Sequence, residues 1–379
     1  MSVTDPEGFR AAGISAGLKG MGRLDLAVVL ADDGPVPAAG VFTQNRAAAA
    51  PVLLSRSRLT SGRARAILLN SGCANAATGD RGWKDAEATT AALAGAVGAS
   101  PEDVLAMSTG PIGSYLDGDA VITRISELVD RASRDGGEQA AQAILTTDSR
   151  IKTVTIRGEG FVVGGMAKGA AMLRPDMATM LCVLTTDASA EAAVLQRALV
   201  DAAATTFNSL NVDGCESTND SLVILASGRA GQVPESELAG AIAKACAALA
   251  SDMAADAEGA SKTVRIMVTG ADDDALARQV GRAIADSALV RASFYGADPN
   301  WGRILAAAGT CPVDVARISI AYQSVPVFQK GAPVEGADLD GLLAADFVVQ
   351  IDLGNGRGRC EVITTDLTPE YVRFNGERS

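Results

Sequence analysis

The stretch KGAAMLRPDMATMLCVL, residues 168–184, combines residue types that could produce a nucleophile. Pro175 fixes its own φ and keeps the residue before it extended, so the chain approaches Ala178 and Thr179 from a constrained turn. Ala178 offers an unhindered carbonyl. Attack by the Thr179 hydroxyl, followed by an N-to-O acyl shift and hydrolysis, would cut the chain between these two residues. Thr179 would then be N-terminal, and its α-amine, with a pKa of about 8, could take the proton of its own hydroxyl.

A base of this kind is needed because the chain contains no histidine. Every mechanism that activates a serine or cysteine through histidine is therefore excluded. Zinc-type sites are also not expected, since scattered cysteines would have to supply the soft ligands. The presence of a threonine at position 179 also has a purely structural explanation, because a β-branched residue suits the start of a strand. Taken alone, the residue favours that structural explanation.

The composition indicates a large enzyme-like protein. The chain has 379 residues, 48% of them hydrophobic, and a net charge of −12, which predicts two domains or lobes and disfavours nucleic acid or anionic membranes as partners. We see no signal peptide and no apolar run near the roughly 20 residues of a membrane span. The six cysteines include no C-x-x-C pair and are typical of buried thiols in a reducing cytosol. We therefore expect a cytoplasmic protein.

The elements that must position Thr179 alternate irregularly between strand and helix. This irregular order predicts an α+β fold of layered sheets covered by helices, not a doubly wound sheet. Ser189 is the expected N-cap of the helix over 189–207. We expect a hairpin over 151–169, with Gly158 and Gly160 at its bend. The other expected strands are 23–32, 63–72, 103–110, 180–188, 220–228, 262–271, 317–328, 346–353 and 358–365, and the other expected helices are 82–98, 117–134, 137–146, 235–257 and 273–291.

The segment GGMAKGAAMLRPDMATMLCVLTTDA closely resembles the cleavage segment of the glutamate N-acetyltransferase/ornithine acetyltransferase family of arginine biosynthesis. The resemblance extends over the whole chain in orderly spacing. Further segments that look like landmarks of the family are EGFRAAGISAGLK (7–19), LNSGCANAATG (69–79), MSTGPIG (107–113), AILTTDSRIK (143–152), VDGCESTNDS (212–221), ADAEGASK (255–262), YGADPNWGRILAA (295–307) and YVRFNGERS (371–379).

The resemblance implies a self-cleaving acyltransferase with an N-terminal-nucleophile type of fold. Cleavage between Ala178 and Thr179 would give an α chain, 1–178, and a β chain, 179–379, which pair into α2β2 or larger assemblies. Thr179 would accept the acetyl group of N2-acetyl-L-ornithine, and L-glutamate would then take it, in a ping-pong reaction that needs no metal or organic cofactor. Some members of the family also use acetyl-CoA as donor, and no residue pattern decides this for the present chain.

The same resemblance assigns Thr109 and Gly110 to the oxyanion hole. The STG sequence at 108–110 ends a strand in a glycine turn, where backbone N–H groups can converge on a developing negative charge. Without the resemblance, the STG sequence would be interpreted as an ordinary turn at the end of a strand. Lys168 is implied to contact substrate, where a cation suits a carboxylate. Alone it would be read as a solvated lysine, since the spacing excludes a phosphate-binding loop.

Four further residues are implied to bind substrate: Thr146, Glu258, Asn375 and Ser379. Glu258 is chemically suited to the ammonium group of ornithine. It could equally be a helix-end carboxylate on an acidic face with nearby aspartates. Ser379 ends the chain four residues after Asn375, whereas the family has its final Ser or Thr five residues after the asparagine, preceded by a tyrosine that is absent here.

Three other positions depart from the family pattern. Ala171 stands where the family often has glycine, Cys73 where it often has asparagine, and Pro111 where it often has an aliphatic residue. None of the three is expected to touch Thr179, Thr109 or Gly110. Three alternatives to the housekeeping transferase stay open at this point: a self-cleaving amidase or aminopeptidase, a related protein acting in a specialised pathway, and an amino-acid binder that has lost cleavage.

Overall fold

The computed structural model describes residues 2–20, 22–171, 180–344 and 346–377. These residues form two compact units. Unit 1 contains the described parts of 1–170 and 180–208 together with 216–253, and unit 2 contains residue 171, 209–215 and the described residues from 254 onward. The units differ from the segments 1–178 and 179–379, which are defined by the predicted cleavage point and remain a prediction.

Unit 1 contains two sheets. The four-stranded sheet has the order β1 (Phe9–Ile14), β2 (Leu26–Ala31), β5 (Ala66–Ser71) and β6 (Val104–Thr109). The six-stranded sheet has the order β4 (Arg63–Ala64), β3 (Val36–Phe42), β10 (Ser221–Gln232), β9 (Leu181–Ser189), β8 (Val162–Lys168) and β7 (Lys152–Arg157). Only the pairs β5–β6 and β9–β10 are parallel.

The two sheets share one apolar layer. Residues of alternate positions on each sheet, such as Val29 and Leu69 on one and Val183 and Val223 on the other, belong to a single buried cluster. Their neighbours in sequence point the opposite way and pack against helices, as the two-residue period of a strand requires. Unit 1 is therefore a layered α+β structure of sheets covered by helices, as the sequence predicts.

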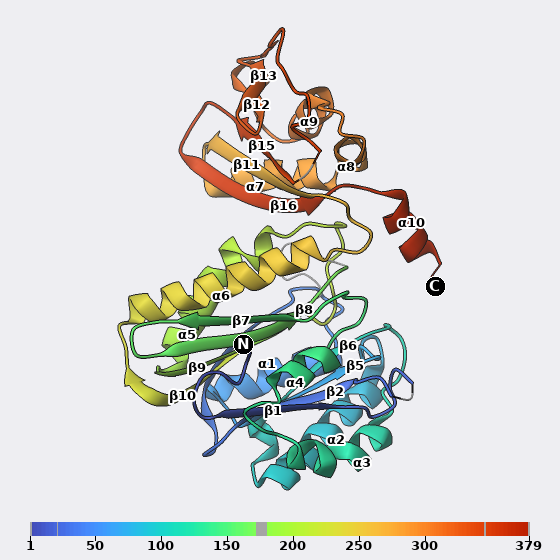
Figure 1. Ribbon diagram of the computed structural model, residues 1–379, viewed down its shortest axis with the longest axis vertical. Coiled ribbons are helices and arrows are strands. Elements are labelled where there is room, and N and C mark those ends of the chain that lie inside the picture. Colours follow the sequence, from blue (N-terminus) through green and yellow to red (C-terminus); the bar gives the residue numbers. More distant parts are fainter. Residues whose placement is uncertain (1, 21, 172–179, 345, 378–379) are drawn as a thin grey trace. The chain divides into compact units, whose positions relative to one another are not determined.

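Helices α2, α3, α5 and α6 cover the outer faces of the sheets, whereas α4 packs at the layer that the sheets share, where its Ala140 and Ala141 belong to the same buried cluster. Figure 1 shows α5 and α6 along the sheet of β7 to β10, and α2 and α3 beyond the sheet of β1 and β2. The bounds are α1 (Ala50–Arg58), α2 (Gly79–Val97), α3 (Gly118–Asp130), α4 (Gly137–Ala143), α5 (Ala192–Thr205) and α6 (Glu235–Ala255), of which the last two residues belong to unit 2. Single 3₁₀ turns lie at Leu59–Ser61, Pro101–Asp103 and Phe207–Ser209.

Among the described helices, α6 is the one long and apolar enough to cross a membrane, with a mean hydropathy of 1.3. The sequence predicts this helix over 235–257, but its apolar character was not foreseen. Half of its most apolar stretch is buried inside the protein, and its residues Ile242, Cys246 and Leu249 are fully buried. A core helix that covers a sheet has this character, so length and composition alone do not make α6 a membrane span.

Unit 2 is one mixed sheet with helices on one face. Its strand order is β14 (Ala332–Pro333), β13 (Val325–Gln329), β12 (Ser319–Tyr322), β15 (Phe347–Asp352), β11 (Thr263–Ala271) and β16 (Gly358–Thr365). A second apolar core joins this sheet to its helices. The helices are α7 (Asp274–Asp286), α8 (Ala288–Tyr295), α9 (Trp301–Ala308) and α10 (Pro369–Gly376), with a 3₁₀ turn at Val315–Arg317.

The structure confirms most expected elements and corrects several. Ser189 is not a helix N-cap: it is the last residue of β9, and α5 begins after Glu191. The expected helix 273–291 breaks at Ser287, whose side chain caps α8. The expected strand 317–328 is a hairpin of β12 and β13. Of the cysteines, Cys215 is exposed and Cys360 is only partly buried, contrary to expectation. Among the described strands and α-helices, six were not foreseen: β1, β3, α1, α9, β14 and α10.

The hairpin over 151–169 is confirmed. Strands β7 and β8 pair antiparallel, and the N–H of Gly158 donates to the carbonyl of Phe161 at 2.9 Å. Gly160 has a φ of 77°, a conformation that favours glycine. This hairpin brings Lys168 to the end of β8, immediately before the segment that leads to Thr179.

A tight contact between β1 and α4 gives a test of this fold. A Cβ at Gly13 would lie 2.1 Å from the carbonyl oxygen of Gln139 on α4, whereas a Cβ at Gly95 of α2 would meet nothing within 4 Å. We expect Gly13→Ala to lower the free energy of unfolding by about 1–3 kcal/mol and Gly95→Ala to raise it by about 0.5–1 kcal/mol. Urea denaturation of both variants checks this, and equal effects would contradict the packing described.

Candidate active site

Two residues assigned from the sequence meet at the ends of strands from different sheets. Thr109 is the last residue of β6 and Lys168 the last residue of β8. The Nζ of Lys168 donates a hydrogen bond to Oγ1 of Thr109 at 3.2 Å. Both residues are only 2% exposed. The lysine is therefore not a solvated surface residue, and the two sheets are linked by a polar contact at the edge of their shared apolar layer.

Gly110 turns the chain sharply after β6. Its φ is 137°, in the region that favours glycine, and a Cβ there would lie 2.5 Å from the backbone nitrogen of Cys73. The N–H of Cys73 donates to the carbonyl of Thr109, and the N–H of Ala74 donates to that of Pro111, both at 3.1 Å. The expectation that Cys73 does not touch Thr109 or Gly110 is therefore wrong, whereas Pro111 contacts Ala74. Their contacts are made by backbone atoms, so they depend little on residue type.

Two asparagines hold the turn in place. Nδ2 of Asn219 donates to the carbonyls of Ala74 (2.7 Å) and Ser108 (2.9 Å). Nδ2 of Asn70 donates to the carbonyl of Cys73 at 2.9 Å, and its Oδ1 accepts from the hydroxyl of Ser108 at 2.5 Å. We did not single these asparagines out in the sequence. Both asparagines lie inside segments that resemble the family, LNSGCANAATG and VDGCESTNDS. Within those segments they look like ordinary turn residues, so the sequence alone does not reveal their role.

Asp148 connects the remaining site residues of unit 1. Its Oδ1 accepts from Nζ of Lys152 and from the N–H of Gly169, both at 2.7 Å. Its Oδ2 accepts from the N–H of Thr146 at 3.1 Å. The side chains of Asp148 and Lys152 are fully buried. One carboxylate thus brings Thr146 to the end of β8, next to Lys168.

The charges in this cluster shift two pKa values. Burial alone would raise the pKa of Asp148, but the charges of Lys168 and Lys152 outweigh it and lower that pKa to about 2. Burial lowers the pKa of Lys19 to about 8, helped by the charges of Arg23 and Lys168 and opposed by those of Asp25 and Asp148. Nζ of Lys19 donates to the carbonyl of Leu145 at 2.5 Å. The region around Lys168 is therefore rich in buried positive charge.

Unit 2 contains Glu258 and Asn375. Glu258 lies three residues beyond the end of α6 and is 8% exposed, so it is not part of a solvated acidic face. The following residue, Gly259, packs against α10: its carbonyl accepts from the hydroxyl of Thr368 at 2.5 Å, and a Cβ there would lie 2.4 Å from the nitrogen of Tyr371. Asn375 is exposed on α10, with Nδ2 donating to the carbonyl of Tyr371 at 3.0 Å.

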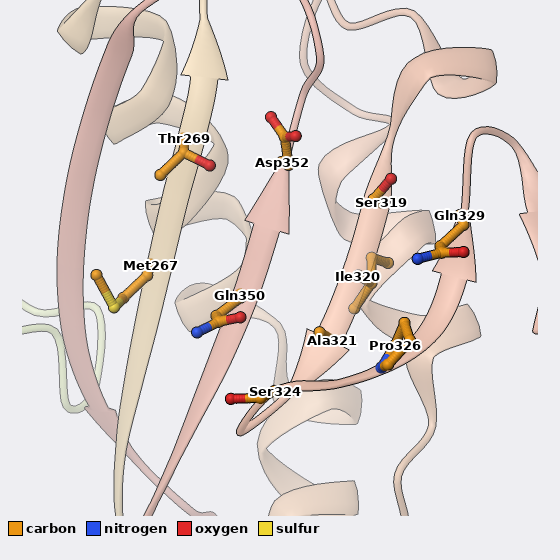
Figure 2. Close-up of a pocket in the computed structure, with 10 residues that line it drawn as sticks. All are labelled: Met267, Thr269, Ser319, Ile320, Ala321, Ser324, Pro326, Gln329, Gln350 and Asp352. Atoms are coloured by element: carbon orange, nitrogen blue, oxygen red, sulfur yellow. The ribbon is translucent and has the colours of Figure 1, made fainter. Parts of the chain in front are cut away.

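Unit 2 also has an open groove of about 450 Å³ on the sheet face opposite its helices. Figure 2 shows side chains of β11, β12, β13 and β15 along it. None of the residues assigned from the sequence lines this groove. The lining residues are Met267, Thr269, Ser319, Ile320, Ala321, Ser324, Pro326, Gln329, Gln350 and Asp352.

The predicted cleavage residues Ala178 and Thr179, and the terminal Ser379, lie outside the described residues. Within the described part of the chain, no group of three or more cysteine, aspartate or glutamate side chains is arranged to hold a metal ion. The site of unit 1 is thus built from a threonine, a glycine turn, lysines and a buried aspartate. Such groups can stabilise an oxyanion and bind a carboxylate.

Comparison with known proteins agrees with this chemistry. A model of the ArgJ family matches residues 10–379. The arginine biosynthesis bifunctional protein ArgJ of Mycobacterium tuberculosis is 46% identical over 391 residues, covering all of this chain and 96% of the relative. The ArgJ protein of Thermobifida fusca is 45% identical, with both chains fully covered. A solved structure of ornithine acetyltransferase with ornithine, from M. tuberculosis, is 44% identical over 48% of this chain and 96% of its own, with a TM-score of 0.45.

These matches define the class of the protein as an enzyme, an acyltransferase. The chain belongs to the ArgJ family. The family resemblance noted in the sequence is thereby confirmed over the length of the chain.

The buried ion pair of Asp148 and Lys152 yields a prediction about stability. Asp148→Asn should lower the free energy of unfolding at pH 7 by about 3–5 kcal/mol, because it removes the charge of the carboxylate that accepts from the buried Nζ of Lys152. Adding Lys152→Met should recover much of this loss. Asp252→Asn is a matched control, since Asp252 pairs with Arg150 on the surface and should cost less than about 1 kcal/mol.

The same pair predicts how stability depends on pH. The pKa of Asp148 is lower in the folded protein, about 2, than its ordinary value of 3.8. The stabilisation from its charge is therefore fully present above the ordinary value and is lost as the pH falls from there toward 2. Urea unfolding between pH 7 and pH 2 should show this loss in the wild type but not in the Asp148→Asn, Lys152→Met double variant. An identical acid profile for both would contradict the assignment.

Proposed function

We propose that the protein transfers an acetyl group from N2-acetyl-L-ornithine to L-glutamate through an acetyl ester on Thr179, after the chain is cut between Ala178 and Thr179. The observation that carries the proposal is the contact between Thr109 and Lys168 at the ends of β6 and β8. Both strands end beside β9, which starts two residues after Thr179 and pairs with β8. The predicted oxyanion turn and a buried cation thus lie near the strand that the nucleophile precedes.

In the proposed reaction, the α-amine of Thr179 takes the proton of its own hydroxyl as Oγ attacks the acetyl carbonyl. The C–O bond of the ester forms, the C–N bond of acetylornithine breaks, and the proton passes to the departing amine of ornithine. The amine of glutamate then attacks the ester, giving N-acetyl-L-glutamate and returning a proton to Thr179. Amine bases of this kind remove the need for histidine.

The oxyanion of each tetrahedral intermediate is assigned to Thr109 and Gly110. The donors we assign are the hydroxyl of Thr109 and the backbone N–H of Gly110, and donors fixed before the reaction stabilise such a charge without reorganisation, often by about 3 kcal/mol. The asparagine contacts to Ser108, Cys73 and Ala74 support this assignment because they make the turn rigid. The hydrogen bond from Lys168 adds a positive charge beside it.

Substrate binding is assigned to Lys168, Thr146, Glu258 and Asn375, with Ser379 as a further residue. Both substrates are α-amino acids with a carboxylate, which suits the lysine-rich region around Lys168. The buried carboxylate of Glu258 suits the side-chain ammonium of ornithine. The low exposure of Lys168 supports exclusion of water, without which the acetyl ester would hydrolyse.

The remaining parts of the proposal concern the mature protein. The α chain 1–178 and β chain 179–379 stay together in an N-terminal-nucleophile type of fold, pair into α2β2 or larger assemblies, and act in the cytoplasm. The reaction uses no cofactor. Acetyl-CoA is a possible second donor to glutamate, which the assay below includes.

The direct test is an assay of acetylornithine with and without glutamate. We expect glutamate-dependent release of ornithine, parallel initial-rate lines when both substrates are varied, and one acetyl group on the β chain when acetylornithine is given alone. A parallel reaction with acetyl-CoA and glutamate tests whether acetyl-CoA also donates an acetyl group to glutamate. Release of ornithine at the same rate without glutamate would identify a hydrolase. Intersecting lines with no labelled β chain would overturn the covalent role of Thr179.

Thr109 provides a separate test of the oxyanion hole. Thr109→Ala should lower kcat by roughly 10²–10³ with a smaller effect on KM, because the interaction strengthens in the transition state. Thr109→Ser keeps the hydroxyl that accepts from Lys168 and should retain most of the activity. A change confined to KM in Thr109→Ala would instead make Thr109 a residue that binds the ground state.

A further inference from the structure

Lys19 lies on the loop between β1 and β2, and its ammonium group joins that loop to the segment after α4. Its Nζ donates to the carbonyl of Leu145 at 2.5 Å and to that of Leu24 at 3.0 Å. It also donates to the carbonyl of Ala143, the last residue of α4, at 3.5 Å. A cation at the end of a helix satisfies carbonyls that the helix leaves without partners. Because Leu145 directly precedes Thr146, Lys19 fixes the segment that carries Thr146.

The backbone of Lys19 is itself held in place by Asp25. Asp25 is fully buried, and its carboxylate accepts from the N–H of Ala16 at 2.5 Å and from the N–H of Lys19 at 3.0 Å. The carbonyl of Asp25 accepts from the N–H of Ser71, the last residue of β5, at 2.9 Å. The side chain of Lys19 therefore starts from a fixed backbone, so its length determines where the carbonyl of Leu145 lies.

The same loop packs against the residue that leads into the predicted oxyanion turn. A Cβ at Gly72 would lie 2.9 Å from the carbonyl oxygen of Leu18 and 3.0 Å from Cγ of Lys19. Gly72 precedes Cys73, whose N–H donates to the carbonyl of Thr109. One loop thus contacts two parts of the site that come from different elements, the backbone beside the oxyanion turn and the segment after α4.

The protonated form of Lys19 matches its surroundings. Three carbonyls accept from Nζ, and an ammonium group has three N–H donors whereas a neutral amine has two. The charged groups that act on it are Arg23 and Asp25 of its own loop, Lys168 at the end of β8, and Asp148 after α4. Burial and the two cations lower the pKa of Lys19 to about 8, against the two aspartates. The third hydrogen bond is therefore lost as the pH rises through that value.

We propose that Lys19 is a positioning residue for substrate binding, whose ammonium group holds the segment after α4 so that Thr146 stays beside the end of β8. Asp148, two residues further along that segment, accepts from the N–H of Gly169 at 2.7 Å, which brings the segment next to Lys168. In this role Lys19 acts through Thr146 and not by contact with substrate. The inference rests on the proposed function, because it takes Thr146 as a substrate-binding residue.

The test uses the full-length protein with Lys19→Met, Lys19→Arg and the matched control Arg58→Met. Lys19→Met keeps a long side chain but removes the donors, and Lys19→Arg keeps donors and a charge that arginine does not lose. Arg58 is also half-buried, and it donates to the carbonyl of Val104 at 2.6 Å. Val104 begins β6, whereas Thr109 ends it, so the control lies away from the site. Steady-state kinetics report kcat and KM, and thermal unfolding reports the fold.

At pH 7 we expect Lys19→Met to raise KM for acetylornithine at least about five-fold with kcat changed less than about two-fold, because it disturbs binding and not the chemical step. Lys19→Arg should return KM to within about three-fold of the wild type. Arg58→Met should lower the unfolding temperature while changing KM less than about two-fold. Thr146→Ala should raise KM as well, and adding Lys19→Met to it should raise KM little further, because both changes remove the same contact.

The dependence of KM on pH separates a charged clamp from a merely structural side chain. From pH 7 to pH 9, KM of the wild type should rise at least about three-fold more than KM of Lys19→Arg, because Lys19 loses its proton over this range and arginine does not. The substrates and the amine of Thr179 titrate in both proteins, so the ratio of the two KM values reports Lys19.

Several results would overturn the inference. These are a wild-type KM in Lys19→Met, an equal rise of KM in Arg58→Met, additive effects of Lys19→Met and Thr146→Ala, and the same pH dependence of KM in the wild type and Lys19→Arg. If Lys19→Met does not fold, the comparison of the wild type with Lys19→Arg decides. A wild type that does not transfer acetyl fails the proposed function and the inference with it, whereas an active wild type with an unaffected Lys19→Met overturns the positioning role alone.

Discussion

The apolar layer shared by the two sheets of unit 1 is the constraint on which the site depends. Polar side chains cannot lie within that layer without partners, so they gather where β6 and β8 end. Thr109 and Lys168 occupy those ends, and both stay buried because they bond to each other. The same layer fixes the direction of β9, and therefore where the chain emerges after Thr179. Chemistry at the strand ends is a consequence of packing between the sheets.

Two buried aspartates show how the surroundings set the state of a carboxyl group. Asp148 lies among lysines, whose charges lower its pKa together with the hydrogen bonds from Lys152 and the N–H of Gly169. Asp220 accepts a hydrogen bond from the N–H of Met180, but burial outweighs this and raises its pKa. Lys168 acts on both. The first carboxylate bonds to Lys152, Gly169 and Thr146, and the second holds the N–H of Met180 at the start of β9.

Local patterns predicted much of the fold and of the site, because strand runs, glycine turns and family landmarks are local. The end of β6 at Thr109 and the hairpin that delivers Lys168 followed from such patterns. The bridging role of Asn219 did not, since its partners Ala74 and Ser108 are distant in the sequence and asparagine is common in turns. Ser189 was misplaced as a cap because β9 continues through it. Asp148 and Asp220 were missed because their importance comes from burial and from partners that only the fold brings together.

The central claim of this account is that Thr179 becomes an N-terminal nucleophile by cleavage of its own chain. The most direct measurement is the intact mass of the purified protein under denaturing conditions, alongside Thr179→Ala. The account predicts two masses for the wild type, corresponding to residues 1–178 and 179–379, and one uncut, inactive chain for the variant, which lacks the hydroxyl that both steps require. A fully active wild-type protein that remains a single chain would contradict it.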